Sequence, residues 1–322
     1  MSVGPDPIRP FLDHHGCVIL DGGLATALEA WGYVLDDRLW SAALLRDAPD
    51  AILAVHRAYL DAGADVVTTA SYQASIPGFV QWGLTDAEAT DLLLRSSKLA
   101  LAARDRYVTH RDPADSRPPP LVAASVGPYG AYLADGSEYD GRYEGVSRSD
   151  LEDFHARRLE ILAGSGVDLL ACETVPSLVE AEVLVTLLSR LSLTVPAWLS
   201  VSCADEGRLH DGTPVEDVAA LASTTERVVA VGVNCTAPRH LRDLVQRIRT
   251  VYDGHVVVYP NSGESYDPET GTWSDGADGA SAVDDGWLRG VLEARAVGAD
   301  VVGGCCRVGP DGIAELRRRM MA

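Results

Sequence analysis

The sequence predicts an α/β protein that folds as a single (β/α)8 TIM barrel, and three observations support this prediction. Eight short segments rich in β-branched residues alternate with helical stretches, which is the pattern of parallel β/α units. A short glycine and aspartate motif recurs before three of these segments. The chain has 322 residues, a length at which barrels commonly form one domain. We therefore expect one domain over residues 1–322.

The eight expected strands follow one another along the whole chain. They are Cys17–Gly23, Asp65–Ala70, Leu121–Gly127, Val167–Thr174, Ala197–Cys203, Val228–Cys235, His255–Asn261 and Asp300–Cys306. The connections between them include helical stretches of about 10 to 18 residues, as in proteins with alternating strands and helices. Eight such units are typical of a closed barrel.

The recurring motif places a glycine at the end of a helix and an aspartate just before a strand. It is GADVV from Gly63, GVDLL from Gly166 and GADVV again from Gly298. Glycine in this position fits the left-handed residue that commonly ends a helix. A doubly wound open sheet is the alternative fold, but the GxGxxG fingerprint of that fold does not follow the first expected strand.

Two connections that follow strands are long, and they cover residues 128–148 and 262–281. In a barrel both overhang the carboxyl-terminal ends of the strands, where the active sites of this fold lie. Loops of this length are usually lids or disordered segments. Tyrosines in the first loop favour a packed lid. They are Tyr129, Tyr132, Tyr139 and Tyr143.

The composition is that of an ordinary soluble protein, with 47% hydrophobic and 23% charged residues. No apolar run approaches the roughly 18 residues of a membrane span. The formal net charge of -20 repels nucleic-acid phosphates and anionic lipids, so we expect small-molecule partners, with a cationic ligand possible. The single lysine, Lys98, lies in a helical stretch, which disfavours Schiff-base chemistry. The N-terminus does not resemble a signal peptide, so we expect a cytoplasmic protein. We also expect a monomer or weak homo-oligomer.

Three cysteines are placed so that a barrel would bring them together. Cys235 ends the sixth expected strand, while Cys305 and Cys306 end the eighth, directly after Gly303 and Gly304. All three thiols then face the same rim. Three thiolates with an open fourth position describe a catalytic zinc site, because structural zinc sites are closed by four protein ligands. The glycine pair would let the backbone turn both following sulfurs toward one ion.

Other interpretations of the cysteines stay open at this point. Taken singly, a free cysteine is more often a buried core residue than a metal ligand. A redox-active disulfide between Cys305 and Cys306 is a second alternative, although it leaves Cys235 unexplained. The remaining cysteines are expected in the core. They are Cys17, Cys172 and Cys203.

Two carboxylates at strand ends form a further candidate site, which suits an amino acid. Asp21 precedes Gly22, Gly23 and a helical stretch, so backbone N–H groups there can receive a carboxylate. Glu173 ends the fourth expected strand, where it can hold an ammonium group, and Cys172 beside it would then point outward. The plainer alternatives are a helix cap for Asp21 and a salt bridge at the rim for Glu173.

These motifs together resemble the zinc-dependent homocysteine S-methyltransferases, and the resemblance covers nearly the whole chain. The motifs are ILDGGLATALEAWG, DVVTTASYQAS, SVGPYGAYLADGSEY, ACETVPSLVEAE, GVNCTAP, YPNSGESY and VVGGCC. The resemblance implies a Zn2+ cofactor bound by Cys235, Cys305 and Cys306. It also implies a methyl transfer to the thiol of L-homocysteine that gives methionine.

The resemblance assigns roles to the other candidate residues. The Asp21–Gly23 segment would receive the carboxylate end of homocysteine and Glu173 its amino group, so Asp21 and Glu173 are the candidate catalytic residues. Tyr72 would lie near the methyl donor, and Asn234 beside the first zinc ligand. A free thiol with a pKa near 8.5 is mostly protonated at neutral pH, so zinc at the substrate sulfur would generate the nucleophile without a general base.

The expected methyl donor is a sulfonium, with S-methylmethionine preferred over S-adenosylmethionine. Tyrosine faces attract cations by about 0.5 to 2 kcal/mol. The betaine-using branch of the family usually carries a C-terminal arm, whereas this chain stops one short helix after Cys306, and folate-using relatives carry cobalamin and further domains. The alternatives are a betaine-using enzyme and a non-catalytic zinc or thiol sensor. A sensor would need the cysteines but not Asp21 or Glu173.

Overall fold

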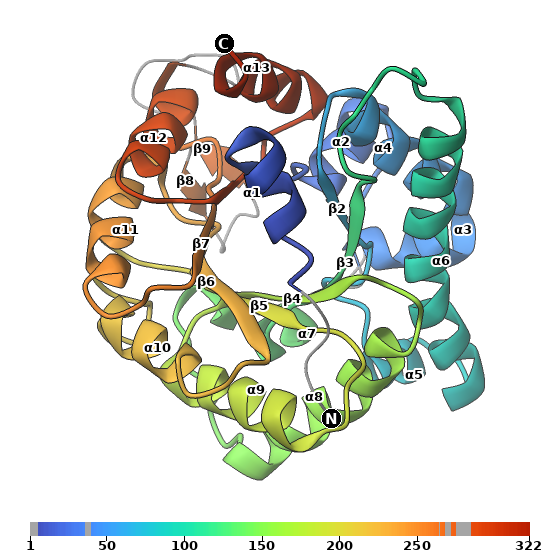
Figure 1. The fold of residues 1–322 in the computed structure, drawn as a ribbon. Helices are drawn as coiled ribbons and strands as arrows, with labels where there is room; N and C mark the ends of the chain where they lie inside the picture. Colours follow the sequence, from blue (N-terminus) through green and yellow to red (C-terminus); the bar gives the residue numbers. More distant parts are fainter. Residues whose placement is uncertain (1–5, 36–39, 264, 268–271, 275–284) are drawn as a thin grey trace.

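The computed structural model confirms the predicted barrel and contradicts the open sheet. It describes residues 6–35, 40–263, 265–267, 272–274 and 285–322. Eight parallel strands form one sheet in the order β1-β10-β7-β6-β5-β4-β3-β2. A bridge between Leu20 and Val66 joins the first strand to the second, so the sheet closes into a ring. Figure 1 shows the helices packed around this ring.

Seven of the eight strands lie within the segments expected from the sequence, and the fourth ends one residue beyond its segment, at Val175 instead of Thr174. The eight strands are β1 (Val18–Ile19), β2 (Val66–Thr68), β3 (Leu121–Val126), β4 (Leu169–Val175), β5 (Ala197–Val201), β6 (Val228–Asn234), β7 (His255–Tyr259) and β10 (Val301–Val302). A separate antiparallel pair is formed by β8 (Ser265–Asp267) and β9 (Thr272–Ser274) in the second long loop. Most of that loop lies outside the described residues.

The helices cover the outside of the barrel, apart from short ones at the rims. They are α1 (Arg9–His15), α2 (Leu24–Ala30), α3 (Leu44–Asp47), α4 (Pro49–Asp61), α5 (Ile76–Gln81), α6 (Asp86–His110), α7 (Tyr129–Leu133), α8 (Arg148–Ala163), α9 (Leu178–Arg190), α10 (Val215–Ala222), α11 (Leu241–Arg249), α12 (Asp285–Ala296) and α13 (Pro310–Met320). Single 3-10 turns occur at η1 (Trp40–Ala43), η2 (Ser137–Tyr139) and η3 (Pro238–His240). Capping boxes begin α6 at Thr85 and α8 at Ser147, which satisfies backbone N–H groups at both helix starts.

The glycines of the recurring motif adopt the left-handed conformation that their position predicts. The φ angles of Gly63, Gly166 and Gly298 are 98°, 89° and 120°. A side chain is strained at such angles, so glycine lets each helix stop and the chain turn into the next strand.

The aspartates of the motif all make the same contact with a neighbouring strand. Asp65, Asp168 and Asp300 each donate a backbone N–H to that strand and accept its N–H at the carboxylate. Asp65 exchanges these two hydrogen bonds with Ile19, Asp168 with Val122 and Asp300 with Val256. Each carboxylate also pairs with an arginine from a surrounding helix: Arg317, Arg104 and Arg249. The repeat therefore ties together the amino-terminal ends of the strands.

The core consists of an inner and an outer shell, because alternate strand residues point to opposite sides of the sheet. Inside the barrel lie Val18, Leu20, Val66, Ala123, Leu169, Ala171, Trp198, Ala230, Val257, Tyr259 and Val301. Ile8 and Phe11, from α1 and the residue before it, join this inner cluster and close the amino-terminal end, where Figure 1 shows α1 across the ring. The larger outer cluster lies between strands and helices.

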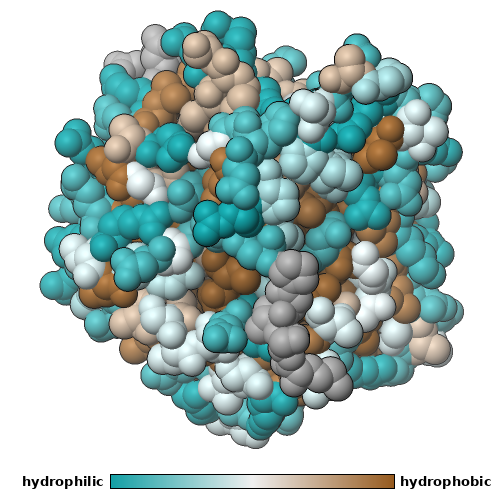
Figure 2. All heavy atoms as spheres, viewed as in Figure 1, coloured by the Kyte–Doolittle hydropathy of each residue, from teal (hydrophilic) through white to brown (hydrophobic). Residues whose placement is uncertain are grey.

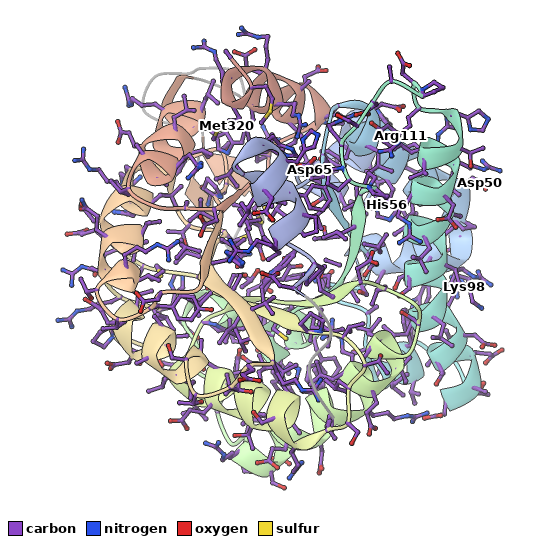
Figure 3. The ribbon with its side chains drawn as sticks, in the orientation of Figure 1. Asp50, His56, Asp65, Lys98, Arg111 and Met320 are labelled. Atoms are coloured by element: carbon purple, nitrogen blue, oxygen red, sulfur yellow. The ribbon has the colours of Figure 1, made fainter. Side chains whose placement is uncertain are left out.

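The amino-terminal face is a mosaic of hydrophilic residues with scattered hydrophobic ones (Figure 2). Among the residues that the structure describes, no helix is both long and apolar enough to cross a membrane. Figure 3 labels Asp65 near α1, where His15 contacts its carboxylate at 3.1 Å, and Lys98 on α6. Lys98 is exposed on the outer helix layer, as expected for a lysine without a role in catalysis.

Candidate active site

The three predicted metal ligands lie together at the carboxyl-terminal ends of β6 and β10. The sulfurs of Cys235, Cys305 and Cys306 are all within 4.8 Å of one another. The Sγ atom of Cys306 lies 3.8 Å from that of Cys235 and 4.0 Å from that of Cys305. All three cysteines are free and partly exposed. The expected convergence of the thiols is confirmed.

The backbone around these cysteines explains how neighbouring thiols can face one point. Strand β10 ends at Val302, so the alternation of side chains has already stopped. Cys235 has a φ of 47°, in the left-handed region, which turns its side chain away from the path of β6.

The glycines before the cysteine pair are required for space rather than for an unusual backbone conformation. A Cβ atom on Gly303 would lie 2.6 Å from the Cβ of Leu20, and one on Gly304 would lie 2.3 Å from a methyl group of Val308. Neither glycine has a positive φ, unlike Arg307 just beyond them. The sequence therefore identified the right glycines, but their function is to let the turn pack closely.

The chemistry of this donor set fits a thiophilic divalent cation such as zinc. Contacts with the Cys305 and Cys306 sulfurs, together with burial, raise the pKa of the Cys235 thiol. Hydrogen bonds from those two neighbours lower the pKa of Cys306, so the cluster stabilises one thiolate by itself. Ionisation of all three thiols requires a positive charge between them.

Glu173 lies on the inner face of β4, and its side chain is buried. Tyr259 donates a hydrogen bond of 2.8 Å to its Oε2, and Ser125 donates one to its Oε1. Burial raises the pKa of Glu173 to about 7, and the charge of Cys305 acts in the same direction. Glu173 forms no ion pair within the described part of the chain, so the rim salt bridge considered from the sequence is absent there.

Sequence reasoning missed the residues that hold Glu173. The hydroxyl of Tyr259 shares a hydrogen bond of 2.6 Å with Ser200 and accepts one of 3.0 Å from Trp198 Nε1. A signal for Tyr259 was present, because it lies in the expected strand His255–Asn261 with the same inward parity as Val257. The contact between Tyr259 and Glu173 crosses the barrel. It depends on the strand register, which cannot be read from the sequence.

Asp21 follows β1, is only 4% exposed and is held by the next strand. Its carboxylate accepts a hydrogen bond of 2.7 Å from the N–H of Thr68 and contacts the hydroxyl of Thr68 at 3.1 Å. Burial raises the pKa of Asp21 well above its ordinary range, and the charge of Glu173 adds to this effect. The N-cap of α2 is Gly23, which has no side chain to cap with, so the simple helix-cap alternative for Asp21 is wrong.

The two glycines after Asp21 allow the cysteine turn to pack against it. A Cβ atom on Gly22 would lie 2.2 Å from the carbonyl oxygen of Val308, and one on Gly23 would lie 2.8 Å from that of Cys305. The N–H of Gly23 donates to Val308 O at 2.9 Å, so this donor is already used. The carboxylate site and the thiol site are therefore adjacent.

Asn234 connects the ends of two strands that carry site residues. It is fully buried, and its amide donates to Thr174 Oγ1 and accepts from Thr174 N, both at 2.7 Å. Thr174 has a φ of 59° and directly follows Glu173, while Asn234 directly precedes Cys235. The geometry thus gives Asn234 a role in fixing the positions of Glu173 and Cys235.

Tyr72 and the first long loop lie on the rim after β2 and β3. A Cβ atom on Gly127 would lie 2.8 Å from the ring of Tyr72, so glycine is required beneath that ring. The ring of Tyr129 packs against those of Tyr132 and Tyr143, and the rings of Tyr129 and Tyr132 also pack against Phe154 of α8. The expected packing of this loop is confirmed for these three tyrosines, and its role as a lid stays a prediction.

The loop also reaches the thiol site, since Glu138 in η2 is close enough to Cys306 for its charge to act on that thiol. The side chain of the fourth loop tyrosine, Tyr139, lies outside what the structure describes.

The remaining cysteines are buried in the outer core cluster, as expected. They are Cys17, Cys172 and Cys203.

The chain is similar in sequence to known proteins over nearly its whole length. The family model described as homocysteine S-methyltransferase matches residues 18–320. Homocysteine S-methyltransferase 4 of Zea mays is 48% identical over 306 residues, which are 94% of this chain and 89% of that protein. Homocysteine S-methyltransferase YbgG of Bacillus subtilis (strain 168) is 43% identical over 311 residues, which are 97% of this chain and 96% of that protein.

A solved structure with the same fold is also similar in sequence. The metallated form of the homocysteine methyltransferase MmuM from Escherichia coli superposes with a TM-score of 0.85 and is 41% identical. The match covers 98% of this chain and 100% of that one. The family expected from the sequence motifs is thus confirmed by sequence and by structure. The chain belongs to the homocysteine S-methyltransferase family, whose members are enzymes.

Proposed function

We propose that this enzyme moves a methyl group from a sulfonium donor to the thiol of L-homocysteine, and that S-methylmethionine is a better donor than S-adenosylmethionine. The observation that carries the proposal is the convergence of three thiols beside two buried carboxylates, Asp21 and Glu173. We also infer that one domain suffices, because the family match over residues 18–320 contains every residue in the proposed site.

The metal in this proposal is zinc, held by Cys235, Cys305 and Cys306. The donor set supports this assignment, since three sulfurs leave a fourth position of a tetrahedral ion for the substrate. When bound, zinc supplies a Lewis acid that lowers the pKa of the homocysteine thiol. Asn234 supports the site by fixing the backbone before Cys235 through its paired bonds to Thr174.

Glu173 is proposed to bind the amino group of homocysteine, as the family resemblance implies. Asp21 is proposed to bind the same amino group rather than the carboxylate end that the resemblance assigns to it, because two carboxylates repel each other. Asp21 and Glu173 are both buried, and their charges repel each other. An ammonium group between them would relieve this repulsion and favour both ionised forms. Tyr259 and Ser125 hold Glu173 in place for this contact. The backbone N–H of Gly22 is left for the carboxylate end of the substrate, because that of Gly23 already donates to Val308 O.

In the proposed reaction, the sulfur of homocysteine attacks the methyl carbon of the donor from the side opposite the leaving sulfur. A new carbon–sulfur bond forms, the donor carbon–sulfur bond breaks, and its electron pair stays on the donor sulfur. The thiol proton passes to solvent. With S-methylmethionine, both products are methionine.

The preference for a cationic donor is supported by the charges around the thiols. Glu173 and Glu138 lie close enough to the thiols for their negative charges to act on the cluster. The ring of Tyr72 can attract a sulfonium, whereas the rings of the lid tyrosines are occupied with one another. We expect S-methylmethionine to be the better of the two sulfonium donors, because the packed lid loop would leave less room for an adenosyl group.

A donor panel tests the proposal. The zinc-loaded enzyme is incubated with homocysteine and, in turn, S-methylmethionine, S-adenosylmethionine and betaine, and methionine is measured. Glu173→Gln tests the proposed contact between Glu173 and the amino group of homocysteine. We expect this variant to keep its zinc but to lose about 10- to 150-fold in kcat/KM, because a charge-assisted hydrogen bond is worth about 1.5 to 3 kcal/mol. Faster turnover with betaine than with either sulfonium would contradict the donor assignment. Zinc binding without methionine from any donor would favour a sensor.

A further inference from the structure

A buried arginine outside the thiol site holds two rim segments together. Arg158 lies in α8 and is 2% exposed. Its Nη1 donates a hydrogen bond of 2.9 Å to the carbonyl of Gly127. Its Nη2 donates to the carbonyls of Ser71 and Tyr72, at 2.5 and 2.6 Å. One guanidinium therefore joins the chain after β2 to the chain after β3.

Among the described residues, backbone carbonyls alone accept the hydrogen bonds of Arg158, although its side chain is buried. Within the described part of the chain, no carboxylate lies at ion-pair distance from Arg158. Burial lowers the pKa of Arg158 to about 10, which still leaves it charged at neutral pH. A buried charge without an ion pair is costly, so the position of the three carbonyls must matter to the protein.

The carbonyls that Arg158 holds control the position of Tyr72. A Cβ atom on Gly127 would lie 2.5 Å from the carbonyl oxygen of Tyr72 and 2.8 Å from its ring. The Tyr72 backbone and ring therefore both lie against Gly127, and Arg158 binds the carbonyls of both residues. Any shift of the guanidinium moves the tyrosine relative to the start of the lid loop.

A second buried group on the same side of the barrel anchors the rest of the loop. Glu180 of α9 accepts hydrogen bonds of 2.6 Å from Tyr129 N and 2.6 Å from the Tyr143 hydroxyl. It also contacts His155 Nε2 at 2.8 Å, three residues before Arg158 in α8. Figure 1 shows α8 and α9 side by side around this part of the barrel. The segment after β2 and the lid loop thus behave as one unit fixed to two helices.

This unit lies between the two carboxylates of the proposed homocysteine site and contains none of the residues proposed to bind zinc or homocysteine. The thiols follow β6 and β10, Asp21 follows β1, and Glu173 belongs to β4. The chain after β2 and β3 is therefore available to the second substrate, next to the first.

We propose that Arg158 is a positioning residue for the methyl donor: it holds Tyr72 and the start of the lid loop in the arrangement that receives the donor. This inference rests on the proposed function for the identity of the substrates. Arg158 itself touches neither the thiols nor Glu173.

The test compares Arg158→Met with a control arginine of the same kind. Arg295 also donates to two backbone carbonyls, those of Gly16 and Ala299, but at the amino-terminal ends of the strands. In Arg158→Met we expect the KM of the donor to rise about tenfold or more, with the KM of homocysteine and the zinc content within about twofold of wild type. In Arg295→Met we expect a lower Tm and no change in either KM.

Two further variants keep the test decisive if Arg158→Met folds poorly. Arg158→Lys keeps the charge but cannot reach all three carbonyls, so it should show a smaller rise in the KM of the donor. Gly127→Ala leaves Arg158 intact and pushes on the ring of Tyr72, so it should reproduce the donor defect. Equal changes in both KM values, or a fall in kcat alone, would overturn the inference.

A readout without catalysis separates this inference from the proposed function. Hydrogen exchange of residues 69–75 and 127–133 should be faster in Arg158→Lys than in wild type, and unchanged in Arg295→Met. The kinetic comparison uses whichever donor the wild-type enzyme turns over best, so a wrong donor assignment leaves it valid. Unchanged exchange in both segments would overturn the positioning role even if the enzyme uses the expected donor.

Discussion

At the level of single residues, the site is built from carboxyl groups that the fold makes difficult to ionise. Glu173 has two hydroxyl donors and lies close enough to Asp21 and Cys305 for their charges to oppose its own. Such a group is stabilised in its ionised form when a cation binds. The same buried charges that suit an ammonium ligand therefore cost stability in the empty site.

This cost predicts how stability depends on pH in the metal-free protein. Burial raises the pKa of Glu173 from 4.5 to about 7, so its favourable contribution is complete below pH 4.5 and is lost as the pH rises through 7. Relative to Glu173→Gln, wild type should therefore lose up to about 3 kcal/mol of unfolding free energy between pH 4.5 and pH 8. Urea unfolding of both proteins at pH 5 and pH 8 measures the difference.

An exposed glutamate provides the control for this measurement. Glu29 lies on the surface of α2. Glu29→Gln should differ from wild type by the same small amount at both pH values, because an exposed carboxylate gains little from folding. A pH-independent difference for Glu173→Gln would show that the carboxylate is not destabilised by burial.

The sequence predicted the residues of this site better than their partners. Cys235, Cys305 and Cys306 were identifiable because strand ends of a barrel meet at one rim. Thr68 was not, because its contact with Asp21 depends on how β1 and β2 pair, and Arg158 was not, because its acceptors are backbone carbonyls of distant segments. Contacts of this kind have no local sequence pattern.

At the level of elements, the recurring aspartate has a common structural function at the start of three strands. Asp168 illustrates it: the carboxylate accepts the N–H of Val122 at 2.7 Å and pairs with Arg104 at 3.1 Å. The motif was visible in the sequence, and its glycine was explained there. The function of the aspartate required the structure, because its partner lies in another strand.

We expect Asp168→Ala to lower the free energy of unfolding by about 1 to 3 kcal/mol, since it leaves a backbone N–H of the sheet without its acceptor and removes one of the two carboxylates that pair with Arg104. Activity at temperatures below the unfolding transition should not change, because the site lies at the opposite end of the barrel. Chemical denaturation and steady-state kinetics measure the two effects.

The matched control is Asp105→Ala, which removes an exposed carboxylate that contacts the same Arg104 at 3.0 Å. Exposed ion pairs contribute about 0 to 1 kcal/mol, so this variant should be nearly as stable as wild type. If Asp105→Ala were as destabilising as Asp168→Ala, the ion pair rather than the strand contact would explain the effect.

At the level of the whole molecule, the barrel is built without contributions from the three thiols. The ring of strands is closed by backbone pairing from β1 and β10 round to β3 and β2, and by the Leu20–Val66 bridge. The inner and outer core clusters fill it with apolar side chains. The three thiols lie beyond the strand ends and are partly exposed, so we expect that the chain folds without the metal.

We therefore expect chelation to remove one zinc per chain and abolish activity while the barrel stays folded, as measured by elemental analysis, methionine formation and circular dichroism. Zinc added back should raise Tm, because a ligand that binds the folded state stabilises it by RT ln(1 + [L]/Kd).

Cys235→Ser, Cys305→Ser and Cys306→Ser should each lose the zinc and its effect on Tm, since two thiolates bind zinc far less well than three. Cys203→Ala is the control. Cys203 is buried in the outer core, so this variant should retain full zinc. Full zinc in Cys305→Ser would remove that residue from the site, and unfolding on chelation would show that the metal is part of the fold.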